Sequence, residues 1–154
     1  MDIRGNWLDL WDGTTEALYS GHKLIGAILL VLVVERLGYR LVRGRPADAP
    51  GLARWQAVIG STNHLLMYAL LVVVPLLGWV GVQLYPALGV FGLFSLPSFL
   101  KADEKTATVV LGWHGAIAYV LLALIALHVA AALYHRFVLR DEVLGRMLPQ
   151  GRGK

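Results

Sequence analysis

Residues 109–135 read VVLGWHGAIAYVLLALIALHVAAALYH, without one Asp, Glu, Lys or Arg. A membrane-spanning helix needs about 20 predominantly apolar residues. The run also lacks the alternation of apolar and polar residues that is typical of membrane β-barrel strands. The stretch therefore predicts a transmembrane helix, and this helix carries two histidines, His114 and His128.

The composition of the whole chain agrees with a membrane protein. Of its 154 residues, 57% are hydrophobic and 16% are charged, and the mean hydropathy is +0.62. Soluble domains average about 45–50% apolar and about 25% charged residues, so a water-soluble enzyme is excluded. The chain has no cysteine, which excludes a disulfide framework, a thiolate-bound iron–sulfur cluster and a CxxCH haem attachment.

Two further apolar stretches, 22–42 and 64–83, have the length of a membrane span. Arg36 and Arg40 lie near one end of the first stretch, where their side chains can extend to the interface. Pro75 lies inside the second, which membrane helices tolerate. We therefore predict an all-α integral membrane helical bundle with three visible transmembrane helices.

The basic residues predict how these helices are oriented. The loop after the first span and the C-terminal tail together carry ten basic residues, against four on the other side. By the positive-inside rule, the loop and the tail face the cytoplasm of a bacterial inner membrane. The ten are Arg36, Arg40, Arg43, Arg45, Arg54, Arg136, Arg140, Arg146, Arg152 and Lys154, and the four are Arg4, Lys23, Lys101 and Lys105.

This orientation divides the chain, as a single membrane domain 1–154, into an outer segment 1–21, the three spans and a cytoplasmic tail 136–154. Residues 84–107 then face outward, as a Gly-, Pro- and Phe-rich loop that lies along the interface. Aromatic residues on that side fit an interfacial belt: Trp7, Trp11, Tyr85 and Trp113.

The outer segment 1–21 has neither the basic nor the apolar region of a signal peptide. Two explanations are open. The three spans insert with the short N-terminus carried across the membrane, or a preceding helix has been lost from the sequence. We favour the second, because it also provides a partner for one of the histidines.

His114 and His128 are fourteen residues apart. On an α-helix this spacing returns to within about 40° of the same direction and rises about 21 Å. Two imidazoles therefore lie on one face at two depths of the bilayer, where polar residues indicate a functional site. The spacing is too long for one metal cluster and suits two haems, one in each leaflet.

Each such haem needs a second imidazole at the same depth. His22 opens the first span at the outer end and is the natural partner of His114. For His128 the candidates are His64 or a histidine on an upstream helix. Interfacial placement is an alternative for His22 and His64, and it is the better interpretation of His135. Arg36 and Arg40 are topology signals that can also pair with the propionates of the inner haem.

Three stretches resemble the bacterial cytochrome b561 family, which is related to the cytochrome b subunits of nickel–iron hydrogenases. They are LYSGHKLIGAILLVLVVERLGYRL, HLLMYALLVVVPLLGWV and WHGAIAYVLLALIALHVAAALYHRFVLRDEVLGRMLP, and they cover most of residues 18–149. The resemblance implies a four-helix bundle with two b-type haems. It implies His22 and His114 as ligands of the outer haem, and His128 with a first-helix histidine for the inner haem. His64 is generally not a ligand in the family, and the first helix has no counterpart in this sequence.

The resemblance implies single-electron transfer through bis-histidine haem b, to or from ubiquinone and with superoxide as a donor in some relatives. Lys23, Lys101 and Lys105 provide local positive charge on the outer side. Residues near a quinone are limited to weak candidates: His135, Arg136 and Trp113. Two alternatives are a membrane anchor that docks a soluble dehydrogenase or hydrogenase, and a non-haem membrane protein. The latter is disfavoured because closely spaced histidines are missing.

Overall fold

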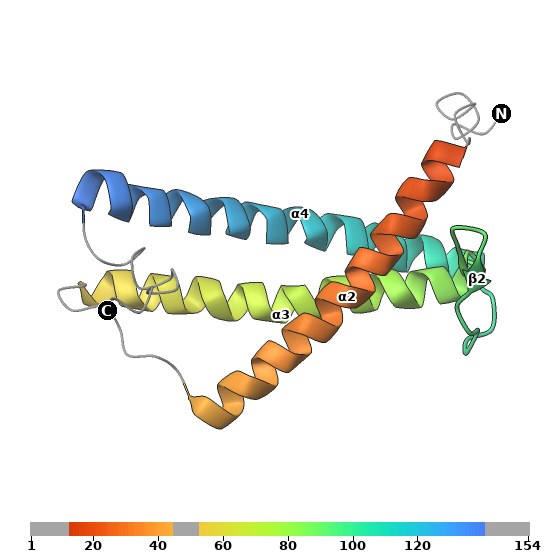
Figure 1. Ribbon diagram of the computed structural model, residues 1–154, viewed down its shortest axis with the longest axis horizontal. Helices are drawn as coiled ribbons and strands as arrows, with labels where there is room; N and C mark the ends of the chain where they lie inside the picture. The colour runs from red at the N-terminus through yellow and green to blue at the C-terminus, as the bar shows by residue number, and fades with distance from the viewer. Residues whose placement is uncertain (1–12, 45–52, 141–154) are drawn as a thin grey trace, which may run out of the picture.

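The computed structural model describes residues 13–44 and 53–140. Three long helices account for most of them (Figure 1): α2 (Gly13–Arg43), α3 (Arg54–Leu84) and α4 (Glu104–Tyr134). Two short strands, β1 (Gly89–Val90) and β2 (Phe94–Ser95), lie between α3 and α4, and a π-helical turn, η1 (His135–Leu139), follows α4. The predictions for the outer segment up to residue 12, for Arg45 and for the tail from residue 141 lie outside the described residues.

The helices are arranged as a pair crossed by a third. Figure 1 shows α3 and α4 side by side, with α2 running obliquely across them. The chain turns back between α3 and α4, so these two helices are antiparallel, and α2 packs on α3 and on β1. We call the end at residues 85–103 the hairpin end and the opposite end of α3 and α4 the loop end.

All three helices are long and apolar enough to cross a membrane. Each predicted span, 22–42, 64–83 and 109–135, lies inside one of these helices or its continuation into η1. Apolar side chains cover the outside, and few hydrophobic residues of the described chain are buried: Val33, Val74, Val90 and Ala107. Such an inverted surface is stable in lipid and not in water. The prediction of a helical membrane bundle is confirmed.

Local sequence accounts for the ends of the helices. The Asp103 side chain accepts a hydrogen bond from the Thr106 backbone N–H (3.2 Å) and a second from its hydroxyl (2.6 Å). This N-cap satisfies one of the free N–H groups at the start of α4. At the start of α3, Gln56 Oε1 accepts from the Ala53 N–H. Pro75 lies within α3 without ending it, as the sequence predicts for a membrane helix.

The segment between α3 and α4 is more ordered than a loop lying along the interface. Its strands β1 and β2 pair antiparallel, and the turn between them places Phe91 and Gly92 at positive φ values of 51° and 66°. Gln83, only 2% exposed, donates to the Pro97 carbonyl (2.8 Å) and accepts from the Phe99 N–H (3.0 Å). These contacts hold the segment against the end of the helical pair.

Candidate functional site

The histidines of different helices lie together in two pairs. His22 of α2 and His114 of α4 have ring centroids 5.8 Å apart and ring planes at 89°. His64 of α3 and His128 of α4 have ring centroids 4.8 Å apart and planes at 62°. The His22 ring is exposed, and the other three residues are half-buried. The first pair lies toward the hairpin end and the second toward the loop end.

His114 is held by a neighbouring helix. Its Nδ1 lies 2.8 Å from the backbone carbonyl oxygen of Val74 in α3. Because a carbonyl only accepts hydrogen bonds, Nδ1 is assigned as the donor, which leaves Nε2 as the ring nitrogen available to a metal. A second partner of this kind is typical of metal-binding histidines and fixes both the tautomer and the orientation of the ring.

The two histidine pairs differ in whether their ring separation matches that of two imidazoles bound to one metal ion. A metal–imidazole bond is about 2 Å long, so two imidazoles on opposite sides of one metal have centroids about 6 Å apart. The 5.8 Å of His22 and His114 fits this arrangement. The 4.8 Å of His64 and His128 is shorter, so these rings have to separate before a metal can bind between them. Within residues 13–44 and 53–140, no three His, Cys, Asp or Glu side chains form a metal cluster.

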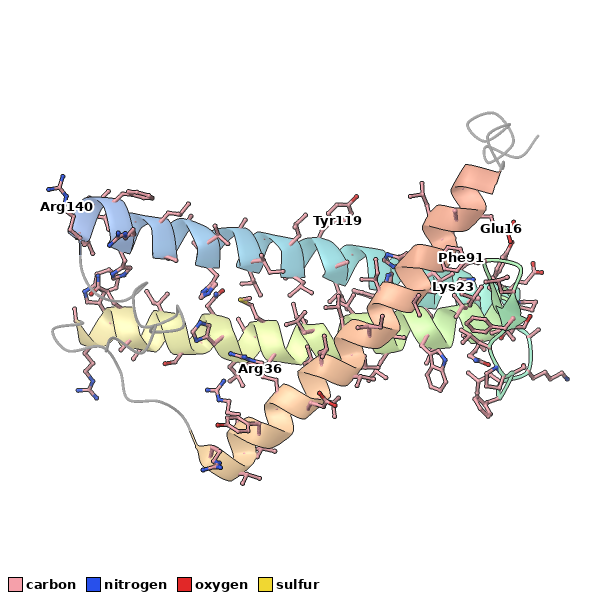
Figure 2. All side chains as sticks on the ribbon, viewed as in Figure 1. Glu16, Lys23, Arg36, Phe91, Tyr119 and Arg140 are labelled. Carbon is pink, nitrogen blue, oxygen red and sulfur yellow. The ribbon has the colours of Figure 1, made fainter. Side chains whose placement is uncertain are left out.

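A cluster of two arginines and a tyrosine lies between α2 and α3. Arg36 Nε donates to the Tyr68 hydroxyl (2.8 Å), and the Arg40 guanidinium lies 5.2 Å from the centroid of the Tyr68 ring. Figure 2 shows Arg36 directed from α2 toward α3. Tyr68 follows His64 by four residues, so both project from nearly the same face of α3. This cluster therefore lies within about one helical turn of the second histidine pair.

The asparagine preceding His64 is buried with an unsatisfied oxygen. Asn63 is 8% exposed, its Nδ2 donates to Met67 Sδ (3.3 Å), and its Oδ1 has no hydrogen-bond partner. A buried amide oxygen without a partner costs free energy unless a ligand or water satisfies it. The loop end thus combines this oxygen with the half-buried imidazoles of His64 and His128.

The lysine next to His22 is engaged with the hairpin. Lys23 Nζ donates to the Ala87 carbonyl (3.0 Å) and to that of Gly89. The hydroxyl of Ser20 accepts from the Phe91 N–H (2.8 Å), and Figure 2 shows Lys23 and Phe91 close together at the hairpin end. The positive charge of Lys23 therefore fastens the hairpin to α2, whereas Lys101 and Lys105 are exposed.

The remaining sequence candidates are His135, Arg136 and Trp113. His135 and Arg136 belong to η1, and the His135 ring lies 6.4 Å from that of Tyr134. Trp113 is 61% exposed on the surface of α4. Sequence reasoning missed the roles of Tyr68, Val74 and Gln83. For Tyr68, the four-residue spacing from His64 could have indicated a shared helix face. The contacts of Val74 and Gln83 depend on tertiary packing, and no local pattern indicates them.

These features define the class of the protein: a multi-pass helical membrane protein in which imidazoles of separate helices face each other across the bundle. A family model described as prokaryotic cytochrome b561 matches residues 3–150. The chain belongs to the prokaryotic cytochrome b561 family, as its sequence motifs predicted, and it is a membrane cytochrome of that family. Membership implies haem b as the cofactor.

Relatives with established names support the assignment. Cytochrome b561 homolog 1 of Escherichia coli (strain K12) is 27% identical over 97% of this chain and 85% of its own length. Cytochrome b561 homolog 2 of the same organism is 28% identical over 96% of this chain and 81% of its own length. A protein of Yersinia pestis named "Probable superoxide oxidase CybB" is 29% identical over 86% of this chain and 75% of its own length.

Proposed function

We propose that this protein carries single electrons across or within the bacterial inner membrane through haem b bound between His22 and His114. The observation that carries the proposal is the 5.8 Å separation of the two rings, which leaves room for one iron between them. When bound, an iron with two imidazole ligands supplies reversible one-electron transfer and has no open position for oxygen.

The protein residues hold this site in three ways. The Val74 carbonyl keeps the proton of His114 on Nδ1 and leaves Nε2 as the ligand atom. The oblique course of α2 across the helical pair (Figure 1) accompanies the close approach of the His22 ring to that of His114, 5.8 Å away. Lys23 and Ser20 fasten the hairpin next to His22 and fix that part of α2.

His128 is proposed as a ligand of a second, inner haem. The family resemblance places its partner on a first helix, whereas the imidazole beside it in the described residues is His64. For His64 to act as that partner, the rings have to move apart by about 1 Å, given the spacing that two metal–imidazole bonds require. The unsatisfied oxygen of Asn63, the residue before His64, supports a ligand in this part of α3.

Arg36 and Arg40 are proposed to pair with the propionates of that inner haem. Neither arginine has an ion-pair partner among the described residues, and both contact the half-buried Tyr68. A guanidinium recognises a carboxylate through two parallel hydrogen bonds. Arg43 at the end of α2 and Arg54 at the start of α3 also support an orientation with this end and the C-terminus in the cytoplasm.

The redox partners are proposed as ubiquinone on one side and, as a donor, superoxide on the other. The name of the Yersinia pestis relative supports the second assignment. The exposed Lys101 and Lys105 can attract a small anion toward the hairpin end. Asp103 and Glu104 lie between them and weaken this attraction.

The proposal is tested by the reduced-minus-oxidised spectrum of the purified protein. We expect the bands of a six-coordinate b-type haem in the wild type. We expect His114→Ala and His22→Ala to remove the haem of the hairpin end, because each deletes one of two ligands. His135→Ala, in the turn after α4, is the matched control and keeps the spectrum. A wild-type protein without any haem band would refute the proposal.

A further inference from the structure

The imidazole of His114 occupies the place of a missing side chain on α3. A Cβ atom built on Gly78 would lie 2.9 Å from His114 Cε1 and 3.0 Å from Nδ1. The first distance is shorter than real Cβ contacts, so the ring or the helix would have to shift, and the second is a tight contact. Gly78 is therefore a position where the backbone of α3 and the ring of His114 meet directly.

The position of Gly78 explains why the Val74 carbonyl can be reached. In an α-helix the carbonyl of Val74 accepts from the N–H of Gly78, four residues later, and keeps a second lone pair. A helical side chain leans over the turn that precedes it. Any side chain at position 78 would thus cover the carbonyl of Val74, and glycine leaves its second lone pair open to His114 Nδ1 at 2.8 Å.

Other glycines of the described helices do not have this relation to a histidine. On α3, a Cβ at Gly81 would meet the aliphatic side chain of Leu111, which is a packing contact. A Cβ at Gly60, also on α3, would meet nothing within 4 Å, and the same holds for Gly112 and Gly115 beside His114 on α4. The contact at Gly78 is therefore specific to the imidazole.

We propose that Gly78 and the backbone carbonyl of Val74 form a seat that positions His114. Gly78 is a positioning residue: it lets the ring reach the carbonyl, the carbonyl fixes the proton on Nδ1, and Nε2 is left as the nitrogen available to the iron. This inference rests on the proposed haem site between His22 and His114. The hydrogen bond also raises the electron-donating power of the imidazole, because partial loss of the Nδ1 proton makes the ring more anionic.

The seat is tested first by Gly78→Ala in the full-length, haem-loaded protein, with Gly60→Ala as the matched control on the same helix. We expect Gly78→Ala to weaken haem retention at this site by roughly 10–100-fold, as loss of a second partner does for other ligating histidines. We also expect a higher midpoint potential and a shifted low-spin ferric EPR signal, because a less anionic imidazole stabilises ferric iron less. Gly60→Ala retains the wild-type values. Unchanged retention, potential and EPR signal in Gly78→Ala would overturn the inference.

A second measurement needs no haem. In full-length apoprotein labelled with ¹⁵N-histidine, NMR shifts report which ring nitrogen of His114 carries the proton, with His114→Ala used to assign the signal. The seat predicts the Nδ1–H tautomer, and an Nε2–H tautomer contradicts it. A wild-type protein that shows the Nδ1–H tautomer and no haem supports the seat while the proposed function fails, so the two failures are distinguishable.

Discussion

The two histidine pairs share α4 but are built differently. At the hairpin end, His114 faces His22 of α2, its ring is seated on α3, and a fastened hairpin lies beside it. At the loop end, His128 faces His64 of α3 at a shorter ring separation. The ring separation of the first pair is close to the roughly 6 Å expected for two imidazoles on one metal ion, and that of the second pair is shorter.

The tilt of α2 explains this difference. Figure 1 shows that α2 lies over the helical pair at the hairpin end and moves away from α4 toward its own C-terminal end. His22 therefore reaches α4, whereas Arg36, more than three turns later, contacts Tyr68 of α3. Among residues 13–44 and 53–140, α3 is the helix that places an imidazole, His64, beside the second histidine of α4. The two histidines on one face of α4 thus meet imidazoles from two different helices, α2 and α3.

The largest effect that tests this comparison is a loss of haem from variants at the loop end. If the second pair holds a haem, His128→Ala and His64→Ala each remove it and leave the hairpin-end haem in place. The measurement is haem per protein with the spectrum of the remaining haem. Tyr119→Phe, on an exposed part of α4 that points away from the other helices in Figure 2, is the control. A second haem that persists in His64→Ala would show that His64 is not its ligand.

Packing between α3 and α4 gives the next largest effect. A Cβ at Gly81 would lie 2.7 Å from Leu111 Cγ, so Gly81→Ala forces the helices apart at the hairpin end. We expect a loss of about 1–3 kcal/mol in the free energy of unfolding, as for other overpacked sites. Gly60→Ala, nearer the loop end, meets open space and is expected to gain about 0.5–1 kcal/mol. Unfolding in mixed detergent measures both, and equal effects would contradict a tighter hairpin end.

The polar clamp of the hairpin end predicts a smaller effect. Gln83→Ala removes the partners of the Pro97 carbonyl and the Phe99 N–H. Residues 97 and 99 are exposed, so water replaces part of the lost bonding, and we expect about 1 kcal/mol of destabilisation. Hydrogen exchange in residues 85–103 should accelerate while the helices stay protected.

The smallest expected effect is the loss of thermal stability at low pH that arises from Asp103, the N-cap of α4. Hydrogen bonds from the Thr106 side chain and then from its N–H lower the pKa of Asp103 below its ordinary value of 3.8. A carboxyl group with a lowered pKa stabilises the folded state above that ordinary value and loses this contribution as the pH falls. When the pH is lowered beneath 3.8, we expect the melting temperature of the wild type to decrease more than that of Asp103→Asn. The asparagine keeps a hydrogen-bond acceptor but does not titrate. Parallel pH profiles would contradict this.

Much of the architecture follows from local sequence. The apolar stretches predict three helices of membrane length, and the structure contains them. The motifs around His22, His64 and His114 predict the cytochrome b561 family, which the family comparison confirms. The spacing of His114 and His128 places two imidazoles on one face because helical periodicity is a property of the chain itself. The ligand roles of these histidines remain predictions.

Other features were not visible in the sequence. The hairpin was expected only as a loop, because its strands are two residues long and are held by Ser20 and Lys23 from a distant part of the chain. Tyr68 was missed as the contact of Arg36 and Arg40 for a similar reason. Such contacts join residues that are remote along the chain, so no local pattern contains them.

The sequence by itself determined that this chain is a helical membrane protein with histidines at two depths of one helix. Apolar length and helical period set those features within each segment, independently of its neighbours. The tertiary structure decided which imidazole faces each histidine of α4, and it placed the carbonyl of Val74 and the bare backbone of Gly78 beneath His114. These choices depend on the crossing angle and register of packed helices, which side chains from all three helices set together.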